Sequence, residues 1–109
     1  MNDLIAKKCL PCEGGVAPLT AAELENHMPK IPGWQLGDDS KEISREFKFA
    51  NFHQTMAFVN AIAWLAHQDN HHPDMAIGYN YCQVRYSTHA IGGLSENDII
   101  CAAKINELL

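Results

Sequence analysis

The chain has 109 residues, of which 47% are hydrophobic and 19% charged, and its formal net charge is −5. This length and composition predict one ordinary globular domain spanning residues 1–109. The acidic balance argues against a nucleic-acid partner, because binding phosphate groups requires a basic surface. The longest apolar run, residues 61–66, is far shorter than the roughly 20 residues that span a bilayer. With no secretory signal pattern, the sequence predicts a cytoplasmic protein that does not bind membranes.

Residues 1–19 contain two prolines and two glycines and are predicted to be irregular. Cys9 and Cys12 in this segment form a single C-x-x-C pair. One such pair is half of a zinc site, and the strand–helix context of a redox motif is missing. We therefore expect neither cysteine to take part in the core chemistry.

The first half of the chain predicts a helix followed by two strands. Thr20 and Glu23 match a capping box, which predicts a short helix over residues 20–28. Residues 33–36 are predicted to form a short strand. Residues 41–49 alternate between apolar and polar side chains, which indicates a second strand with one buried face. A turn over residues 37–40 would join these two strands in a hairpin.

Asn51 is a favourable N-cap for a long helix predicted over residues 51–68. Apolar residues at helical spacing predict its buried stripe: Phe52, Met56, Val59, Ala63 and Ala66, widened by Phe58, Ile62 and Leu65. Trp34 and Trp64 are both expected in the core. The helix should end before Pro73, which cannot continue it.

The second half predicts another pair of strands and a last helix. Residues 75–79 and 81–88 are rich in Ile, Val and Tyr and are joined by a predicted tight turn near residues 79–80. Ser95 and Asp98 match a second capping box, which predicts a helix running to the C-terminus. The order helix–strand–strand–helix–strand–strand–helix predicts an α+β fold. It is a two-layer sandwich with a four-stranded antiparallel sheet and three helices packed on one face.

The histidines are the best candidates for chemistry. His71 and His72 follow the long helix and His89 ends the last strand, so the three can lie at one end of the sheet. Proton transfer is one interpretation, because histidine titrates near neutral pH. A metal site is another, because His67 and His71 are four residues apart, although the helix should end between them. A polar loop with surface histidines is the third. Cys82 is expected to be a small apolar filler rather than a nucleophile.

Asp98 also has two interpretations. It can serve only as the third residue of the predicted capping box. It can also be a carboxylate that orients His89. The sequence leaves both open.

Several motifs together carry a resemblance to a known family. NHHPD (70–74), STH (87–89) and GGLSENDI (92–99) occur in that order. They are preceded by CEGGVAPLT (12–20), PGW (32–34) and REFKFANF (45–52). Over residues 12–108 the sequence resembles the pterin-4a-carbinolamine dehydratase family.

The resemblance implies the same α+β fold and a dehydratase. Such an enzyme removes water from 4a-hydroxytetrahydropterin to give quinonoid dihydropterin, and so recycles the pterin cofactor of aromatic amino acid hydroxylases. It implies no metal and no organic cofactor. It also implies a homodimer or homotetramer, for which the apolar residues of the last helix would serve, and a hydroxylase as a further partner.

The resemblance assigns His71 and His89 as the catalytic acid/base pair, with His72 catalytic mainly by binding and orienting the pterin. Asp98 falls on a supporting aspartate of the family. The remaining substrate contacts would come, largely through the backbone, from four residues: Pro73, Asp74, Ser87 and Thr88.

The chain departs from many members at two positions. His67 stands where many carry Glu, and Met75 where many carry Trp. These departures bear on substrate fit and turnover rather than on reaction type. The alternative function is a pterin-binding or protein-binding dimerization module with little or no dehydratase activity.

Overall fold

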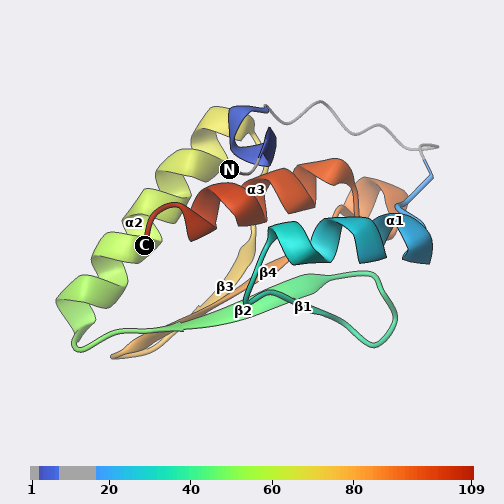
Figure 1. Ribbon diagram of the computed structural model, residues 1–109. Coiled ribbons are helices and arrows are strands. Elements are labelled where there is room, and N and C mark those ends of the chain that lie inside the picture. The colour runs from blue at the N-terminus through green and yellow to red at the C-terminus, as the bar shows by residue number, and fades with distance from the viewer. Residues whose placement is uncertain (1–2, 8–16) are drawn as a thin grey trace.

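The protein is described by a computed structural model that places residues 3–7 and 17–109. These residues form α-helices, β-strands and short 3₁₀ turns (Figure 1). In chain order they are η1 Asp3–Ala6, α1 Ala21–His27, η2 Met28–Lys30, β1 Gln35–Leu36, β2 Ile43–Lys48, α2 Phe52–Asp69, β3 Asp74–Ile77, β4 Tyr81–Tyr86, η3 His89–Ile91 and α3 Glu96–Asn106. Cys9 and Cys12 lie outside the described residues.

The four strands form one antiparallel sheet in the order β1-β2-β4-β3. Two hairpins, β1–β2 and β3–β4, meet along β2 and β4, where Phe47 lies opposite Cys82. All three α-helices cover the same face of this sheet, and α3 lies between α1 and α2 (Figure 1). The predicted α+β fold and its order of elements are confirmed.

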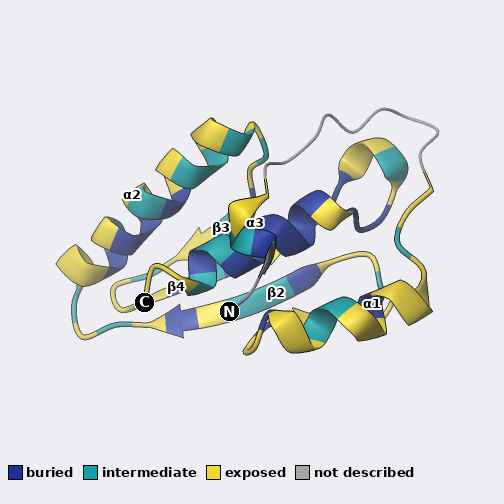
Figure 2. Cartoon of the chain, turned by 45° about the horizontal axis from the view of Figure 1, so that its top comes forward, coloured by how far each residue is buried: buried dark blue, intermediate teal, exposed yellow. Residues whose placement is uncertain are grey.

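The core lies between the sheet and the helices. On β2 the alternating residues Ile43 and Phe47 are buried, as the period of two predicts. The helix α3 is buried almost all round, unlike the exposed outer faces of α1 and α2 (Figure 2). A helix that is enclosed in this way holds even its polar side chains in a dry environment, which matters for Asp98.

The buried stripe of α2 differs from the predicted one. Its buried residues are Thr55, Phe58, Val59 and Ile62, whereas Phe52 is 46% exposed and Ala63 is exposed. Trp34 is buried as expected, but Trp64 is 61% exposed, so its predicted place in the core is wrong. The reason lies in Thr55, whose single hydroxyl proton is shared between the carbonyl oxygens of Asn51 at 2.9 Å and Tyr79 at 3.0 Å. A polar residue with one local and one distant partner thus occupies the inward face of the helix, which is therefore not purely apolar.

Two polar contacts hold α3 against its neighbours. Near its C-terminal end, the Oδ1 of Asn106 accepts hydrogen bonds from Trp34 Nε1 at 2.9 Å and from Arg45 Nη1 at 2.7 Å. Two residues earlier, Lys104 Nζ lies 2.8 Å from Asp69 Oδ2, at the end of α2. These contacts fix α3 relative to β2 and to the end of α2, and so fix where its N-terminal turn points.

The first and last elements also differ from prediction at their ends. Part of the segment expected to be irregular forms the turn η1, which buries Leu4 and places Lys7 Nζ 3.0 Å from Glu96 Oε1. The helix α3 was predicted to run to the C-terminus but ends at Asn106, and Leu108 beyond it is 40% exposed. No helix among the described residues is long and apolar enough to cross a membrane.

Candidate active site

The turn that carries the paired histidines begins at the end of α2. Asn70 adopts the left-handed conformation (φ 51°, ψ 42°), which asparagine tolerates better than most residues. The N–H of His71 then donates to the carbonyl of Ala66 at 3.1 Å, and that of Asn70 to His67. This is the hydrogen-bond pattern of a Schellman motif, which ends the helix and fixes the direction in which the chain leaves. Pro73 is buried and restricts the backbone of His72, so the pair of histidines lies between a fixed helix end and a proline.

His71 and Asp98 form the central contact of the site. The Nε2 atom of His71 lies 2.6 Å from Asp98 Oδ1, and the two side chains are 14% and 0% exposed. The two residues are 27 positions apart in the sequence. Their meeting depends on α3 presenting its first turn to the end of α2.

The second oxygen of the Asp98 carboxylate is occupied by two other donors. Thr88 Oγ1 donates to Oδ2 at 2.7 Å, and the backbone N–H of Ser95 donates at 2.9 Å. The Ser95 hydroxyl lies 2.8 Å from Thr88 Oγ1. Asp98 therefore collects hydrogen bonds from three segments: the turn after α2, the end of β4 and the N-cap of α3. A buried carboxylate with three such partners is a fixed acceptor.

The imidazole of His71 is also held on one face. The ring of Tyr86, at the end of β4, stacks on it with a centroid separation of 5.6 Å and an interplanar angle of 7°. Tyr86 is itself 1% exposed. Packing on a buried ring leaves the imidazole little freedom to turn about its own axis.

His72 and His89 are both exposed, so the structure separates the three histidines into one enclosed and two open side chains. His89 begins the turn η3, which is closed by the Thr88 N–H donating to Gly93 O at 2.8 Å and by Gly92 in the left-handed conformation (φ 65°). It directly follows Thr88, which bonds Asp98. The backbone of His89 is therefore joined directly to a residue of the His71–Asp98 network.

The predicted substrate contacts fall on different surfaces. Asp74 is exposed at the start of β3, Ser87 is half-buried, and Pro73 is buried within the turn. Thr88 is 5% exposed, and its hydroxyl is directed toward Asp98. Its side chain thus serves the internal network, a role that the sequence analysis did not foresee.

The partner of Asp98 differs from the one that the sequence suggested. We considered a carboxylate orienting His89, and the structure joins it to His71 instead. Asp98 also serves in the capping box of α3, as predicted, so the same side chain caps the helix and contacts His71. Tyr86 and Ser95 were not recognised as parts of the site. The only signal in the sequence was their closeness to the STH and SEND motifs.

The arrangement of the described residues does not support a metal site at the histidines. Among them, no group of three or more His, Cys, Asp or Glu side chains is arranged to hold a metal ion. His67 is exposed on α2 and its ring lies 5.4 Å from that of Trp64. Cys82 is buried in the sheet, and this burial raises the pKa of its thiol, which disfavours a nucleophilic thiolate.

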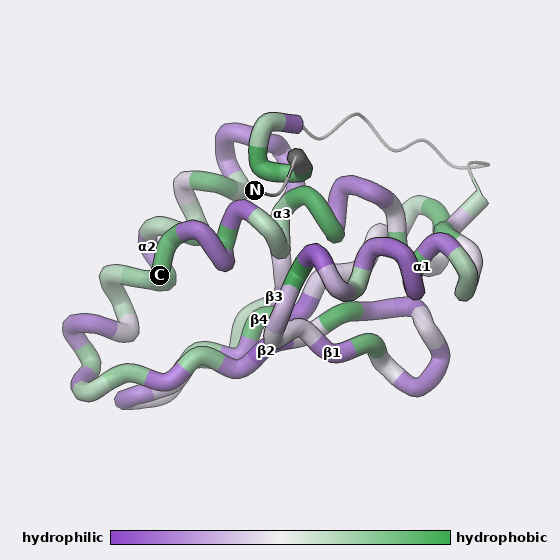
Figure 3. Tube along the Cα trace, in the orientation of Figure 1, coloured by the Kyte–Doolittle hydropathy of each residue, from purple (hydrophilic) through white to green (hydrophobic). Residues whose placement is uncertain are grey.

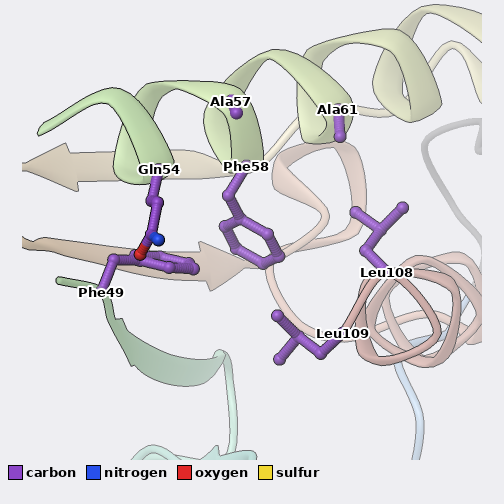
Figure 4. A pocket seen from close by; sticks show the side chains of 7 residues that line it. All are labelled: Phe49, Gln54, Ala57, Phe58, Ala61, Leu108 and Leu109. Atoms are coloured by element: carbon purple, nitrogen blue, oxygen red, sulfur yellow. The ribbon is translucent and has the colours of Figure 1, made fainter. Parts of the chain in front are cut away.

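A separate apolar hollow lies near the opposite end of α2. It has a volume of about 370 Å³ and is lined by seven residues: Phe49, Gln54, Ala57, Phe58, Ala61, Leu108 and Leu109. Phe58 points from α2 into it, between Phe49 and the two terminal leucines (Figure 4). No histidine or carboxylate lines this hollow, so it offers no acid or base and is not the candidate catalytic site.

The comparison with known protein families agrees with the geometry. The pattern of the family described as pterin 4 alpha carbinolamine dehydratase matches residues 17–108, which include every residue of the His71 network. The chain belongs to this family. Its motifs from NHHPD to GGLSENDI supply the contacts just described.

Relatives at high identity cover nearly the whole chain. A protein of Nitrosomonas eutropha, provisionally named pterin-4-alpha-carbinolamine dehydratase, is 62% identical over 98% of this chain and 94% of its own length. A Legionella pneumophila protein with the same provisional name is 51% identical over 99% of this chain and 96% of its own.

Two solved structures share the fold. The crystal structure of a transcriptional coactivator/pterin dehydratase from Brucella melitensis is 34% identical, covers 84% of this chain and 97% of its own, and has a TM-score of 0.80. A pterin dehydratase-like protein, described as a RuBisCO assembly factor in the alpha-carboxysome, is 22% identical, covers 72% of this chain and 92% of its own, and has a TM-score of 0.62. At that identity the second likeness shows the fold alone.

Proposed function

We propose that this protein dehydrates 4a-hydroxytetrahydropterin to quinonoid dihydropterin by histidine acid/base catalysis, and so returns an oxidised pterin to the cycle that serves aromatic amino acid hydroxylases. The observation that carries this proposal is the contact of His71 with the buried Asp98, within a chain of the matching family. A carboxylate that holds one nitrogen of an imidazole makes the other nitrogen a well-oriented site for accepting or donating a proton.

The reaction needs two proton transfers. The C4a–O bond breaks as the hydroxyl oxygen receives a proton and leaves as water. The N5–H proton is removed, and the N5 electron pair forms the C4a=N5 double bond. An acid and a base on the enzyme balance these two transfers, and no electron is gained or lost overall. His71 and His89 are the proposed pair, one enclosed beside Asp98 and one at the open edge.

The remaining predicted residues have binding roles in this proposal. His72, exposed next to His71, contacts and orients the flat pterin. Pro73 fixes the turn that presents both histidines. Backbone groups of Asp74, Ser87 and Thr88 supply further hydrogen bonds at the edge of the sheet. Met75 is only half-buried, at the position where many family members carry Trp, so it would contact the pterin more weakly than an aromatic wall.

The test is the rate of dehydration of 4a-hydroxytetrahydrobiopterin, followed in the ultraviolet, for wild type, His71→Ala and His89→Ala, with and without a chelator. We expect each substitution to slow the reaction by about 10²–10⁴-fold, because each removes one proton-transfer group. The chelator should change nothing. The matched control is His53→Ala, which removes an exposed histidine from the first turn of α2, far from the site, and should retain the wild-type rate.

An absence of acceleration by the wild type would contradict the proposal. It would favour the alternative function, a pterin-binding or protein-binding module. The Brucella melitensis protein of similar structure is itself described as a transcriptional coactivator as well as a pterin dehydratase. Loss of activity with the chelator would instead show that the reaction requires a metal ion.

We also propose that copies of this chain associate through the outer face of α2 to form a homo-oligomer. The helix contains no Lys, Arg or Glu, whereas the outer face of a helix on a monomer is usually charged. Its middle shows little of the strongly hydrophilic colour seen on α1 (Figure 3). The face exposes Trp64 and Ala57, the kind of side chains that interfaces bury. An uncharged face also lets two copies of an acidic protein approach without repulsion.

The last helix is a poorer candidate than its sequence suggested. Cys101 and Ile105 are 4% and 0% exposed, because they pack into the core of their own chain. Light scattering should give wild type a molar mass that is a multiple of 12.1 kDa, and Trp64→Glu should reduce it toward one chain. Glu25→Gln, an exposed change on α1, is the control and should not alter the mass. A wild type that is already monomeric at micromolar concentration would contradict this proposal.

A further inference from the structure

We propose that Thr88 and Ser95 are positioning residues, whose two hydroxyl groups fix the tautomer of His71 through the carboxylate of Asp98. The basis is a continuous hydrogen-bonded path from Ser95 Oγ through Thr88 Oγ1 to Asp98 Oδ2, and from Asp98 Oδ1 to His71 Nε2. This path reaches the imidazole through the carboxylate, so we infer that both hydroxyls act on His71 through Asp98.

The direction of every bond in this path follows from the chemistry of the groups. Asp98 Oδ2 receives two donors, the Ser95 N–H and the Thr88 hydroxyl, so the Thr88 proton points to the carboxylate. A hydroxyl has only one proton. Thr88 Oγ1 must therefore accept at its contact with Ser95, and the Ser95 hydroxyl must donate.

This arrangement leaves Asp98 Oδ1 as the oxygen that faces His71. With Oδ2 saturated by two donors, the carboxylate cannot turn without losing both of them. His71 meets Oδ1 at 2.6 Å, and the matching donor is its Nε2–H. The neutral imidazole is thereby set in the Nε2–H tautomer.

Burial gives this network its strength. Thr88, Ser95 and Asp98 are 5%, 9% and 0% exposed. Water therefore competes weakly for their hydrogen bonds, and the low local dielectric strengthens them. An exposed hydroxyl in the same position would exchange partners with solvent and impose no direction on the carboxylate.

The kinetic part of this inference rests on the proposed dehydratase function, whereas the tautomer does not. The experiment compares wild type, Thr88→Val and Thr88→Ser, each with ¹⁵N-labelled histidine. Two-bond ¹H–¹⁵N spectra at a pH where the imidazole is neutral report the tautomer of His71, whose signals are identified by their loss in His71→Ala. Steady-state kinetics are measured on the same samples.

We expect His71 to be in the Nε2–H form in wild type and in Thr88→Ser, which keeps the hydroxyl. Thr88→Val has the same shape but no hydroxyl, and should populate both tautomers. Its kcat should fall by about ten- to a hundredfold, as for a misplaced catalytic group. KM should change little, because the substitution changes only the side chain, which faces Asp98, and leaves the proposed backbone contacts of Thr88 in place. Asn51→Ala is the control: it removes the N-cap of α2 at the end opposite His71, so it lowers stability and leaves the His71 tautomer unchanged.

Two results would overturn the inference: a wild-type His71 in the Nδ1–H form, or a folded Thr88→Val with unchanged nitrogen shifts and kcat. If Thr88→Val does not fold, Ser95→Ala decides by the same criteria, because it removes the donor to Thr88. If Thr88→Val changes the His71 tautomer but the wild type has no dehydratase activity, the inference about Thr88 and Ser95 is upheld and the proposed function is contradicted.

Discussion

Two helices of this protein begin with the same motif, and only one of the two motifs reaches the candidate site. At the start of α1, Glu23 N donates to Thr20 Oγ1 at 3.2 Å and Thr20 N donates to Glu23 Oε1 at 2.9 Å. At the start of α3, Ser95 N donates to Asp98 Oδ2 at 2.9 Å. Glu23 is exposed, whereas Asp98 is 0% exposed and also binds His71 and Thr88.

The difference shows that a capping box fixes a local backbone but not the role of its carboxylate. The N-terminal turn of α1 faces solvent, so the second oxygen of Glu23 is left to water. The N-terminal turn of α3 is covered by the end of β4 and the turn after α2, so the second oxygen of Asp98 faces protein donors. Exposed carboxylates contribute little to stability, and buried ones that gain several donors contribute more.

Replacing each of the two carboxylates with its amide should have very different effects at α3 and at α1. In Asp98→Asn the amide oxygen can still accept from Thr88 and Ser95, which turns the NH₂ group toward His71. Two donors cannot face each other, so the imidazole must change to the Nδ1–H tautomer. We expect activity to fall by about 10²-fold or more, and the free energy of unfolding by about 1–3 kcal/mol as charged hydrogen bonds are lost.

Glu23→Gln is the matched control for that change. It keeps a capping side chain on an exposed turn, so its stability should stay close to that of wild type and its activity should not change. The measurements are urea unfolding and the dehydration assay. Equal losses from the two substitutions would show that Asp98 acts only as a cap.

At α1 the pH should have a smaller effect, on the stability that Glu23 contributes. Hydrogen bonds from the backbone N–H and then from the side chain of Thr20 hold the pKa of Glu23 below its ordinary value of 4.5. Because the folded state binds this proton less readily than the unfolded chain, the contribution of Glu23 is complete above pH 4.5 and is lost as the pH falls through its folded pKa. Melting curves of wild type and Glu23→Gln between pH 3 and 7 should therefore differ by a small, constant amount above pH 4.5 and converge below it.

The control for the pH series is Glu25→Gln, a change on the same helix outside the capping box. A difference between wild type and Glu23→Gln that grows as the pH falls would contradict the expected sign.

Much of the fold could be predicted from local patterns. Asn51, Thr20 and Ser95 marked the beginnings of the three helices, because a cap satisfies backbone groups within its own turn. The alternation around Ile43 and Phe47 gave the buried face of β2. The polar residue on the inward face of α2 could not be predicted in the same way. Thr55 faces inward only because the carbonyl of Tyr79, from a distant hairpin, is there to accept its hydroxyl.

The sequence predicted the candidate site in part. The features it did not predict are contacts between segments that are far apart in the chain. By themselves the residues indicated the α+β order of elements, the histidines of NHHPD and STH, and the carboxylate of SEND, because each signal lies within a few neighbouring positions. Only the tertiary structure decided that Asp98 meets His71, that Thr88 and Ser95 complete its hydrogen bonds, and that Trp64 remains outside the core. The physical reason is that a local pattern fixes dihedral angles and caps, whereas burial and side-chain partners depend on how α3 packs against segments far away in the chain.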